Sequence, residues 1–226
     1  MNIKFINADI LTMDDQNPTI RGGCLVIKDK AIEYCGKTDL NGKFDRVIDC
    51  KGDILMPALF NCHSHLAMSL FRGTAENKNL NDWLYDLIFP MEKNLKEEDV
   101  YFGTMLSIAE SVRGGVATLC DSYFFNEQSA EAAKISGVNM VLMGADMDLN
   151  QSTDAVMEKI QSDYRKYNNV SGNISYIAGC HSVYTCSIEL LEAIADFSAQ
   201  KKCKTYIHLS ETLKEVGDCT EKYDGL

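Results

Sequence analysis

Residues 54–66, ILMPALFNCHSHL, form an apolar stretch that carries one proline and ends with two histidines, and this stretch decides the fold. A strand of mostly hydrophobic residues is expected to be buried on both faces, as in a parallel sheet. Because side chains alternate along a strand, His63 and His65 point to the same side. Two imidazoles on one side of the strand supply half of the ligands of a metal site. The alternative is one core histidine beside one solvated histidine.

The composition is that of an ordinary soluble globular protein. The chain has 226 residues, of which 46% are hydrophobic and 24% charged, with a formal net charge of −11. This charge argues against nucleic acid or an anionic membrane as a partner, since an acidic chain does not neutralise phosphates. No apolar run reaches the roughly 18 residues of a membrane helix, and residues 1–10 lack the regions of a signal peptide. We therefore expect a cytoplasmic protein whose nine cysteines are free thiols.

The hydrophobic pattern changes at residue 54, which predicts two domains, 1–53 and 54–226. The first contains short alternating segments separated by turn residues, a pattern that predicts a small antiparallel β unit. The second alternates strand and helix patterns. Strands are expected at 54–66, 116–122, 138–145, 174–183 and 204–209, and helices at 96–113, 126–136, 152–167 and 187–200. In the first helix Val100, Leu106, Ala109 and Val112 are expected to face inward.

The order of these elements predicts an α/β fold with a parallel sheet. No Gly-x-Gly-x-x-Gly follows the first strand, which disfavours a dinucleotide-binding sheet. The remaining common choice is a (β/α) barrel, which takes about 250 residues and eight strands. Residues 54–226 supply about five strands, so either the sheet is open or the last three βα units of a barrel are missing.

All four histidines fall at predicted C-terminal strand ends, where the functional residues of a barrel lie. His63 and His65 close the first strand, His181 the fourth and His208 the fifth. Glu211 follows His208 by three residues. It is either a proton shuttle above a metal held by three of the histidines, or a glutamate in the first turn of a helix, where the helix dipole favours it.

The donor set predicts one divalent metal. Two-metal hydrolases on such barrels use a bridging carboxylate, often a carbamylated lysine. Residues 174–184 contain no lysine and have His181 instead. Three imidazoles with a carboxylate and a water suit zinc, with ferrous iron as the alternative.

Four segments resemble the amidohydrolase superfamily, and within it the deaminases of the 5′-methylthioadenosine/S-adenosylhomocysteine and chlorohydrolase type. They are MPALFNCHSHLAMSLFRG at 56–73, LNDWLYDLIFPMEKNL at 80–95, GCHSVYTCS at 179–187 and IHLSET at 207–212. The resemblance implies that His63, His65 and His208 are metal ligands. It also implies that Glu211 is the general acid and base in the hydrolytic deamination of an adenosine-like nucleoside.

The same resemblance implies roles for residues outside the metal site. Glu92 would face the ribose hydroxyls, and His181 would contact the substrate. Trp83 would belong to a loop that shapes the pocket, with a core indole as the alternative. Residues 1–53 would be part of a small β-sandwich that accompanies the barrel. Residues 137–148 contain no arginine, whereas related deaminases often carry some there, and have Asn139 and Met143 at the expected places.

The family's further histidine after strand six and its metal-binding aspartate after strand eight would lie beyond Leu226. We therefore expect a C-terminally truncated chain, incomplete for catalysis, that associates with another copy or with a separate remainder. Two alternatives stay open. One is a hydrolase of the same superfamily that acts on another heterocyclic C–N or C–Cl bond, and the other is an inactive fragment that serves in assembly.

Overall fold

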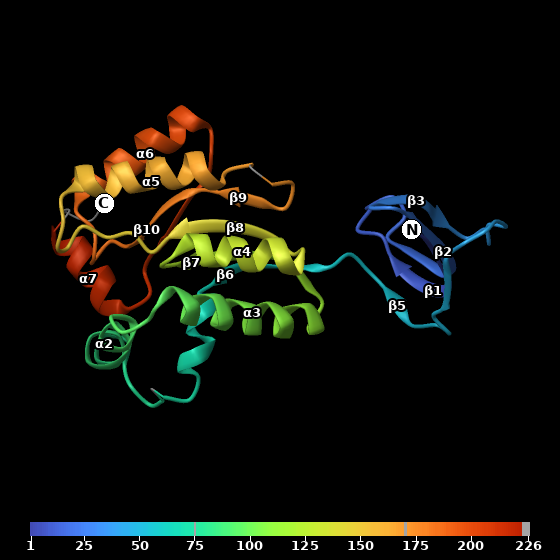
Figure 1. The fold of residues 1–226 in the computed structure, drawn as a ribbon, viewed down its shortest axis with the longest axis horizontal. Coiled ribbons are helices and arrows are strands. Elements are labelled where there is room, and N and C mark those ends of the chain that lie inside the picture. Colours follow the sequence, from blue (N-terminus) through green and yellow to red (C-terminus); the bar gives the residue numbers. More distant parts are fainter. Residues whose placement is uncertain (75, 170, 223–226) are drawn as a thin grey trace. The chain divides into compact units, whose positions relative to one another are not determined.

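The computed structural model describes residues 1–74, 76–169 and 171–222, and the chain divides into two compact units with the boundary between Ala58 and Leu59 (Figure 1). The first unit is a five-stranded sheet. Its strands are β1 (Asn2–Leu11), β2 (Thr19–Lys28), β3 (Ala31–Gly36), β4 (Arg46–Asp49) and β5 (Ile54–Leu55). The antiparallel prediction holds for the pairs β1–β2 and β2–β3 but is wrong for β4 and β5, which run parallel to β1. The connection between β3 and β4 is too long for a hairpin turn, so the chain crosses to the other edge of β1.

Residues 54–66 are divided between the two units after Ala58. β5 pairs with β1, whereas β6 (Leu59–Ser64) begins the second unit and pairs with β7 (Val116–Tyr123). The expected burial on both faces is wrong, because Leu59 is 50% exposed and Phe60 is 70% exposed. Within the described part of the chain β6 has β7 as its only paired strand, so its other edge is uncovered. The domain boundaries 1–53 and 54–226 stay a prediction, and residues 223–226 lie outside those described.

The second unit alternates strands and helices after β6. Its elements are the 3-10 helix η1 (Leu66–Phe71), α1 (Leu80–Asp82), the π-helical η2 (Trp83–Ile88), α2 (Phe89–Glu92), α3 (Glu97–Arg113), β7, α4 (Asn126–Ser136), β8 (Asn139–Gly144), α5 (Thr153–Tyr167), β9 (Ile174–Tyr176), β10 (Ala178–Ser182), α6 (Ile188–Lys201), β11 (Thr205–His208) and α7 (Leu213–Lys222).

The strands of the second unit are parallel. They are hydrogen-bonded in the order β6–β7–β8–β9, and β10 pairs with β11. β9 and β10 together occupy the single strand expected at 174–183, which is interrupted at Ile177. The N–H of Ile177 donates to the carbonyl of Leu142 in β8 at 3.0 Å, so the interrupted strand stays beside β8. These five strand positions with helices between them confirm the α/β class.

Helices α3, α4, α5 and α6 follow one another along the strands (Figure 1). α3 packs beside α4 and α5 beside α6, and Lys166 of α5 pairs with Glu127 of α4 at 2.8 Å, so the helices form one continuous layer. Between helices and strands lies the main hydrophobic core, whose largest fully buried members are Tyr176, Leu119, Met140, Leu142, Ile160 and Leu190. This core fixes the strands and therefore the positions of the residues at their C-terminal ends.

The inward face of α3 differs from the expected one. Val100 is fully buried, but Leu106 and Val112 are 45% and 53% exposed, and Ile108 is buried instead. The reason lies at Gly103, where a Cβ atom would come within 2.8 Å of the Ala67 carbonyl oxygen in η1. Because η1 approaches the helix at this glycine, the buried face centres there rather than on the larger apolar side chains.

The helix ends follow the signals in the sequence. The Ser152 hydroxyl accepts a hydrogen bond from the Ala155 N–H at 3.3 Å, and the Ser187 hydroxyl accepts one from the Leu190 N–H at 3.1 Å. Each therefore caps the start of its helix. Gly137 ends α4 with φ +79°, a left-handed conformation that glycine adopts without strain.

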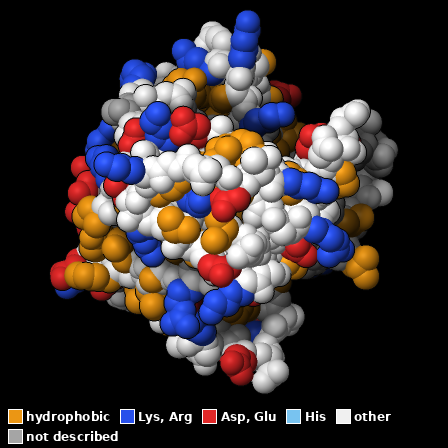
Figure 2. All heavy atoms as spheres, turned by 90° about the vertical axis from the view of Figure 1, so that its right-hand side faces the viewer, with side chains coloured by type: hydrophobic (Ala, Val, Ile, Leu, Met, Phe, Trp, Pro, Cys, Tyr) orange, Lys and Arg blue, Asp and Glu red, His pale blue; other side chains and the backbone are white. Residues whose placement is uncertain are grey.

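The surface mixes charges of both signs. On the face shown in Figure 2, Lys and Arg side chains lie among Asp and Glu side chains, with small hydrophobic groups between them. In the N-terminal unit Arg21 pairs with Asp9 at 3.1 Å and Lys28 with Glu33 at 3.4 Å. Among the described residues, no helix is both long enough and apolar enough to cross a membrane.

Candidate active site

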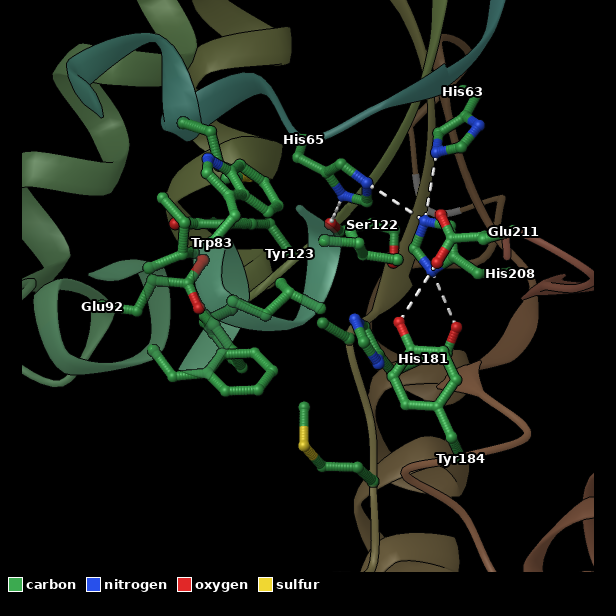
Figure 3. Close-up of a pocket in the computed structure, with 18 residues that line it drawn as sticks. His63, His65, Trp83, Glu92, Ser122, Tyr123, His181, Tyr184, His208 and Glu211 are labelled. Atoms are coloured by element: carbon green, nitrogen blue, oxygen red, sulfur yellow. Dashed lines mark hydrogen bonds between the residues drawn. The ribbon is translucent and has the colours of Figure 1, made fainter. Parts of the chain in front are cut away.

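Three histidines from two strands that are far apart in the sequence converge at the C-terminal ends of those strands (Figure 3). His63 lies near the end of β6, His65 follows that strand, and His208 ends β11. The Nε2 atom of His208 lies 3.1 Å from Nε2 of His63 and 3.2 Å from Nε2 of His65. The three ligand atoms all lie within 4.8 Å of one another, so one small ion can contact all of them.

Hydrogen bonds at the other ring nitrogen fix the tautomer of two of these imidazoles. Nδ1 of His65 lies 2.7 Å from the carbonyl oxygen of Ser122, and Nδ1 of His208 lies 2.7 Å from the carbonyl oxygen of His181. A carbonyl oxygen only accepts, so each Nδ1 carries the hydrogen and each neutral ring presents a lone pair at Nε2. Burial lowers the pKa of His65, which favours its neutral form.

The convergence of these Nε2 atoms fits a bound cation. Two lone pairs that face each other at 3.2 Å repel, and a positive ion between them removes that repulsion. Backbone acceptors behind the metal-facing nitrogen are the usual support of a histidine ligand. The donor set of three imidazoles matches the ligand chemistry of zinc and also accepts other transition metals.

Glu211 lies beside the three histidines, in the turn between β11 and α7 (Figure 3). Its Oε2 atom accepts a hydrogen bond from the Tyr184 hydroxyl at 3.1 Å. α7 begins at Leu213, so Glu211 precedes the helix, and the alternative of a glutamate in its first turn is wrong. The carboxylate faces the same cavity as the histidines, which is where a group that exchanges protons with a bound substrate is needed.

A cavity of about 240 Å³ opens in front of the histidines. Glu92, at the end of α2, lines it, and burial raises the pKa of this carboxyl while the neighbouring Tyr123 hydroxyl opposes the rise. Trp83 from η2 also lines the cavity, as expected for a residue that shapes the pocket. The remaining apolar wall consists of Met68, Leu80, Leu84, Ile88, Phe89, Phe124, Ala145 and Met147.

His181 lines the same cavity from the end of β10. Its Nδ1 atom lies 2.9 Å from the Thr185 hydroxyl and 3.2 Å from the Ser182 hydroxyl. Burial, with smaller contributions from His208 and His65, lowers the pKa of His181 to about 4. The ring is therefore neutral near pH 7, and its Nε2 atom is left for a molecule in the cavity.

Asn139 and Met143 do not reach this cavity. Asn139 begins β8 and is exposed, with its amide 3.4 Å from the Thr118 hydroxyl. Met143 is 1% exposed and lies deeper, below the histidines. In this part of the chain, the residues that line the cavity are Ala145 and Met147, which follow the end of β8. The expected positions were therefore placed too early in the sequence.

Two residues that contact Glu211 were missed by the sequence analysis. Tyr184 donates to its carboxylate, and the Glu215 carboxylate accepts hydrogen bonds from the N–H groups of Ser210 and Glu211 at 2.9 and 2.8 Å. A signal for Glu215 was present, because Thr212 and Glu215 have the spacing of a capping box. No spacing rule pointed to Tyr184.

The sequence matches the model of the amidohydrolase family over residues 54–225. It is 34% identical to a 5-methylthioadenosine/S-adenosylhomocysteine deaminase of Thermoanaerobacter pseudethanolicus, over 99% of this chain and 52% of that protein. It is 37% identical to a 5′-deoxyadenosine deaminase of Methanobrevibacter smithii, over 91% of this chain and 48% of that protein. The chain therefore spans about half the length of the curated relatives it matches.

Solved structures show the same fold. An adenosine deaminase from Xanthomonas campestris with bound zinc matches with a TM-score of 0.91 and 24% identity, over 99% of this chain and 52% of that one. An atrazine chlorohydrolase from Arthrobacter aurescens, complexed with zinc, matches with a TM-score of 0.89 and 22% identity, over 99% of this chain and 56% of that one. The described strands of the second unit are thus part of a (β/α) barrel. The chain belongs to the amidohydrolase family.

Proposed function

We propose that this chain carries the metal-binding half of an enzyme that hydrolytically deaminates adenosine-like nucleosides. The observation that carries the proposal is the convergence of three imidazole Nε2 atoms beside Glu211 in one cavity that Glu92 also lines. The names of relatives at 34% and 37% identity, both deaminases of such nucleosides, support it. A cytoplasmic location is part of the proposal, since all nine cysteines are free thiols.

In this proposal His63, His65 and His208 hold one divalent metal. Zinc is the first candidate, because both zinc-containing neighbours share this fold, and ferrous iron is the second. When bound, the metal supplies the Lewis acidity that makes a water nucleophilic near neutral pH.

Glu211 moves the protons of the reaction. It accepts a proton from the attacking water and delivers it to a ring nitrogen as the water oxygen bonds to the carbon that bears the amino group. It then takes the proton of the hydroxyl now on that carbon and passes it to the departing nitrogen, so that the C–N bond breaks, the carbon becomes a carbonyl and ammonia leaves. The hydroxyl of Tyr184 lies 3.1 Å from Oε2 of this carboxylate.

Glu92 and His181 orient the substrate. The Glu92 carboxyl is half-buried and can accept hydrogen bonds from ribose hydroxyls, which holds the base within reach of Glu211. His181 is neutral, and its free ring nitrogen faces the cavity, where it can pair with the base. The apolar wall around Trp83 and Phe89 suits the flat face of a purine.

The test is ammonia release by the zinc-loaded chain from 5′-deoxyadenosine, methylthioadenosine, S-adenosylhomocysteine and adenosine. Glu211→Gln is expected to lower kcat by about 100-fold or more, because general acid–base catalysis contributes that much. Glu221→Gln, on the exposed surface of α7, is the matched control. Tight zinc binding without ammonia release from any of the four nucleosides, also after a C-terminal remainder is added, would contradict deamination and favour a role in assembly.

A second candidate is hydrolysis of another C–N or C–Cl bond on a heterocycle that carries no sugar. The position of Glu92 in the cavity discriminates between the two, since a bare ring offers it no hydroxyl. Glu92→Ala is expected to raise KM for nucleosides by about tenfold, because it removes a hydrogen bond to a charged group. An unchanged KM would favour the second candidate.

A further inference from the structure

Glu211 is held at two points by residues to which the proposed function assigns no step. Its side chain contacts Tyr184, which follows β10, and its backbone N–H contacts Glu215, in α7. The two contacts come from opposite directions along the chain, one from 27 residues before Glu211 and one from 4 residues after it. The turn that carries Glu211 is otherwise exposed, so these contacts determine where its carboxylate lies.

Glu215 is an unusual residue in its helix. Of the ten residues of α7, all of which are described, Glu215 alone is buried, at 6% exposure. Its two carboxylate oxygens accept from the N–H groups of Ser210 and Glu211 at 2.9 and 2.8 Å, while its own N–H donates to the Thr212 hydroxyl at 3.1 Å. In a standard capping box the glutamate would accept from the N–H of Thr212 itself. Here it reaches further back and closes the turn that leads to Glu211.

The backbone of this turn needs such support. Ser210 has φ +58°, a left-handed conformation that costs a non-glycine residue free energy. The N–H groups of Ser210 and Glu211, on either side of this bend, both point toward Glu215. A carboxylate that accepts from both stabilises the bend with charge-assisted hydrogen bonds.

Tyr184 acts on the carboxylate of Glu211. Its hydroxyl donates to Oε2 at 3.1 Å, and its ring packs edge-on against His181 at a centroid distance of 5.8 Å. Burial raises the pKa of Tyr184, so the phenol keeps its proton and remains a donor at neutral pH. The contact therefore restricts a side chain that would otherwise rotate freely in an exposed turn.

We propose that Tyr184 and Glu215 are positioning residues, which together hold the Glu211 carboxylate at the mouth of the cavity where it exchanges protons with the substrate. The inference rests on the proposed function, because it concerns the residue that moves protons there. Tyr184 lines the cavity beside Glu211, whereas Glu215 is not among the residues that line it. Each acts through Glu211, one on its side chain and one on its backbone.

The experiment compares Tyr184→Phe and Glu215→Gln with matched controls in the zinc-loaded chain. Tyr34→Phe removes a hydroxyl that accepts from the Thr38 N–H in the N-terminal unit, and Glu221→Gln removes an exposed charge from α7. Each positioning variant is expected to lower kcat for methylthioadenosine by about 10–100-fold, since a misplaced catalytic group can cost that much. In Glu215→Gln, KM is expected to stay within about twofold, because Glu215 does not line the cavity, and the controls keep the wild-type kcat. Wild-type kcat in both positioning variants overturns the proposal.

A second measurement does not depend on activity. Backbone amide exchange at Ser210 and Glu211 is expected to accelerate about tenfold or more in Glu215→Gln, because a glutamine offers one acceptor oxygen for two N–H groups. It is expected to stay unchanged in Glu221→Gln. If the wild-type chain releases no ammonia, the proposed deamination fails, and the exchange comparison still decides the support of the turn. Unchanged exchange in Glu215→Gln overturns the inference.

Discussion

At the scale of single residues, the hydrogen bond at one ring nitrogen determines what the other nitrogen of a histidine can bind. His65 and His208 donate from Nδ1 to carbonyl oxygens, whereas Nδ1 of His181 lies beside hydroxyls and its ring faces the cavity. The two groups of histidines therefore differ in role even though all of them lie close together.

This difference predicts which histidines hold the metal. Replacing His63 or His208 by alanine is expected to weaken zinc binding by more than about 100-fold, since even partners behind a ligand are worth 10–100-fold. His181→Ala is expected to leave zinc affinity nearly unchanged. Competition with a chromophoric chelator measures the affinities. Equal losses in all three variants would contradict the assignment of ligands.

Asp121 predicts a pH dependence of stability. It is 1% exposed, accepts hydrogen bonds from the Leu66 N–H and the Ser129 hydroxyl, and burial raises its pKa to about 6. An aspartate in the unfolded chain titrates near pH 4, so between about pH 4 and pH 6 the folded state retains a proton that the unfolded state loses. The contribution of Asp121 to the free energy of unfolding therefore falls as pH rises through that window.

Asp121→Asn is expected to remove this contribution. Its Oδ1 still accepts from Leu66 and its amide can donate to Ser129, so the buried hydrogen bonds are kept. Relative to wild type, the variant should gain roughly 2–3 kcal/mol of unfolding free energy between pH 4 and pH 7. Urea unfolding at several pH values measures the difference, and parallel pH curves for the two proteins would contradict it.

Much of the site geometry could be predicted from the sequence. His63 and His65 share a side because side chains alternate along a strand, and His208 joins them because parallel strands end at the same edge. These rules concern the backbone alone. Tyr184 and Glu215 could not be placed in this way, because their contacts depend on the paths of two loops and on which way a side chain turns within them.

At the scale of elements, the end of α4 offers a test of backbone conformation. Gly137 has φ +79°, and a Cβ atom built there would meet nothing within 4 Å. Gly137→Ala is therefore expected to lower the free energy of unfolding by about 1 kcal/mol through backbone strain alone. Gly172→Ala, where space is also open and φ is not positive, is the control and should change stability by less than about 0.5 kcal/mol. Thermal or urea unfolding measures both, and equal changes would argue against the strain.

The elements also show where sequence patterns stop being informative. The helix predicted at 126–136 is α4 with the same bounds, because glycine and a small-residue pattern mark it clearly. The prediction for the buried face of α3 was wrong, because apolar residues lie on several sides of this helix. The contact of α3 with η1 is marked by a glycine and not by a large side chain. The helical segments from Leu80 to Glu92 were not predicted, since a wide π-helical turn and Pro90 disturb the usual period.

At the scale of the whole molecule, the second unit exposes apolar surface along β6. Leu59 and Phe60 are largely exposed, and within the described residues the outer edge of β6 has no strand beside it. Such edges favour association with other chains. Association with a second copy or with a separate C-terminal part stays a prediction.

Native mass spectrometry tests this prediction of association. The expected result is a native mass above the 25.2 kDa of one chain, which falls toward that value in Phe60→Ser because the apolar contact is weakened. A stable, metal-loaded monomer of 25.2 kDa would contradict it.

The chain contains a single tryptophan, Trp83, and it lies in the wall of the cavity. Its indole emission therefore reports on one place in the molecule, without any label. A purine that stacks on this wall should quench or shift the emission, so nucleoside binding can be titrated by fluorescence even where no product forms. The protein thus contains an optical probe at the point where its ligand is expected.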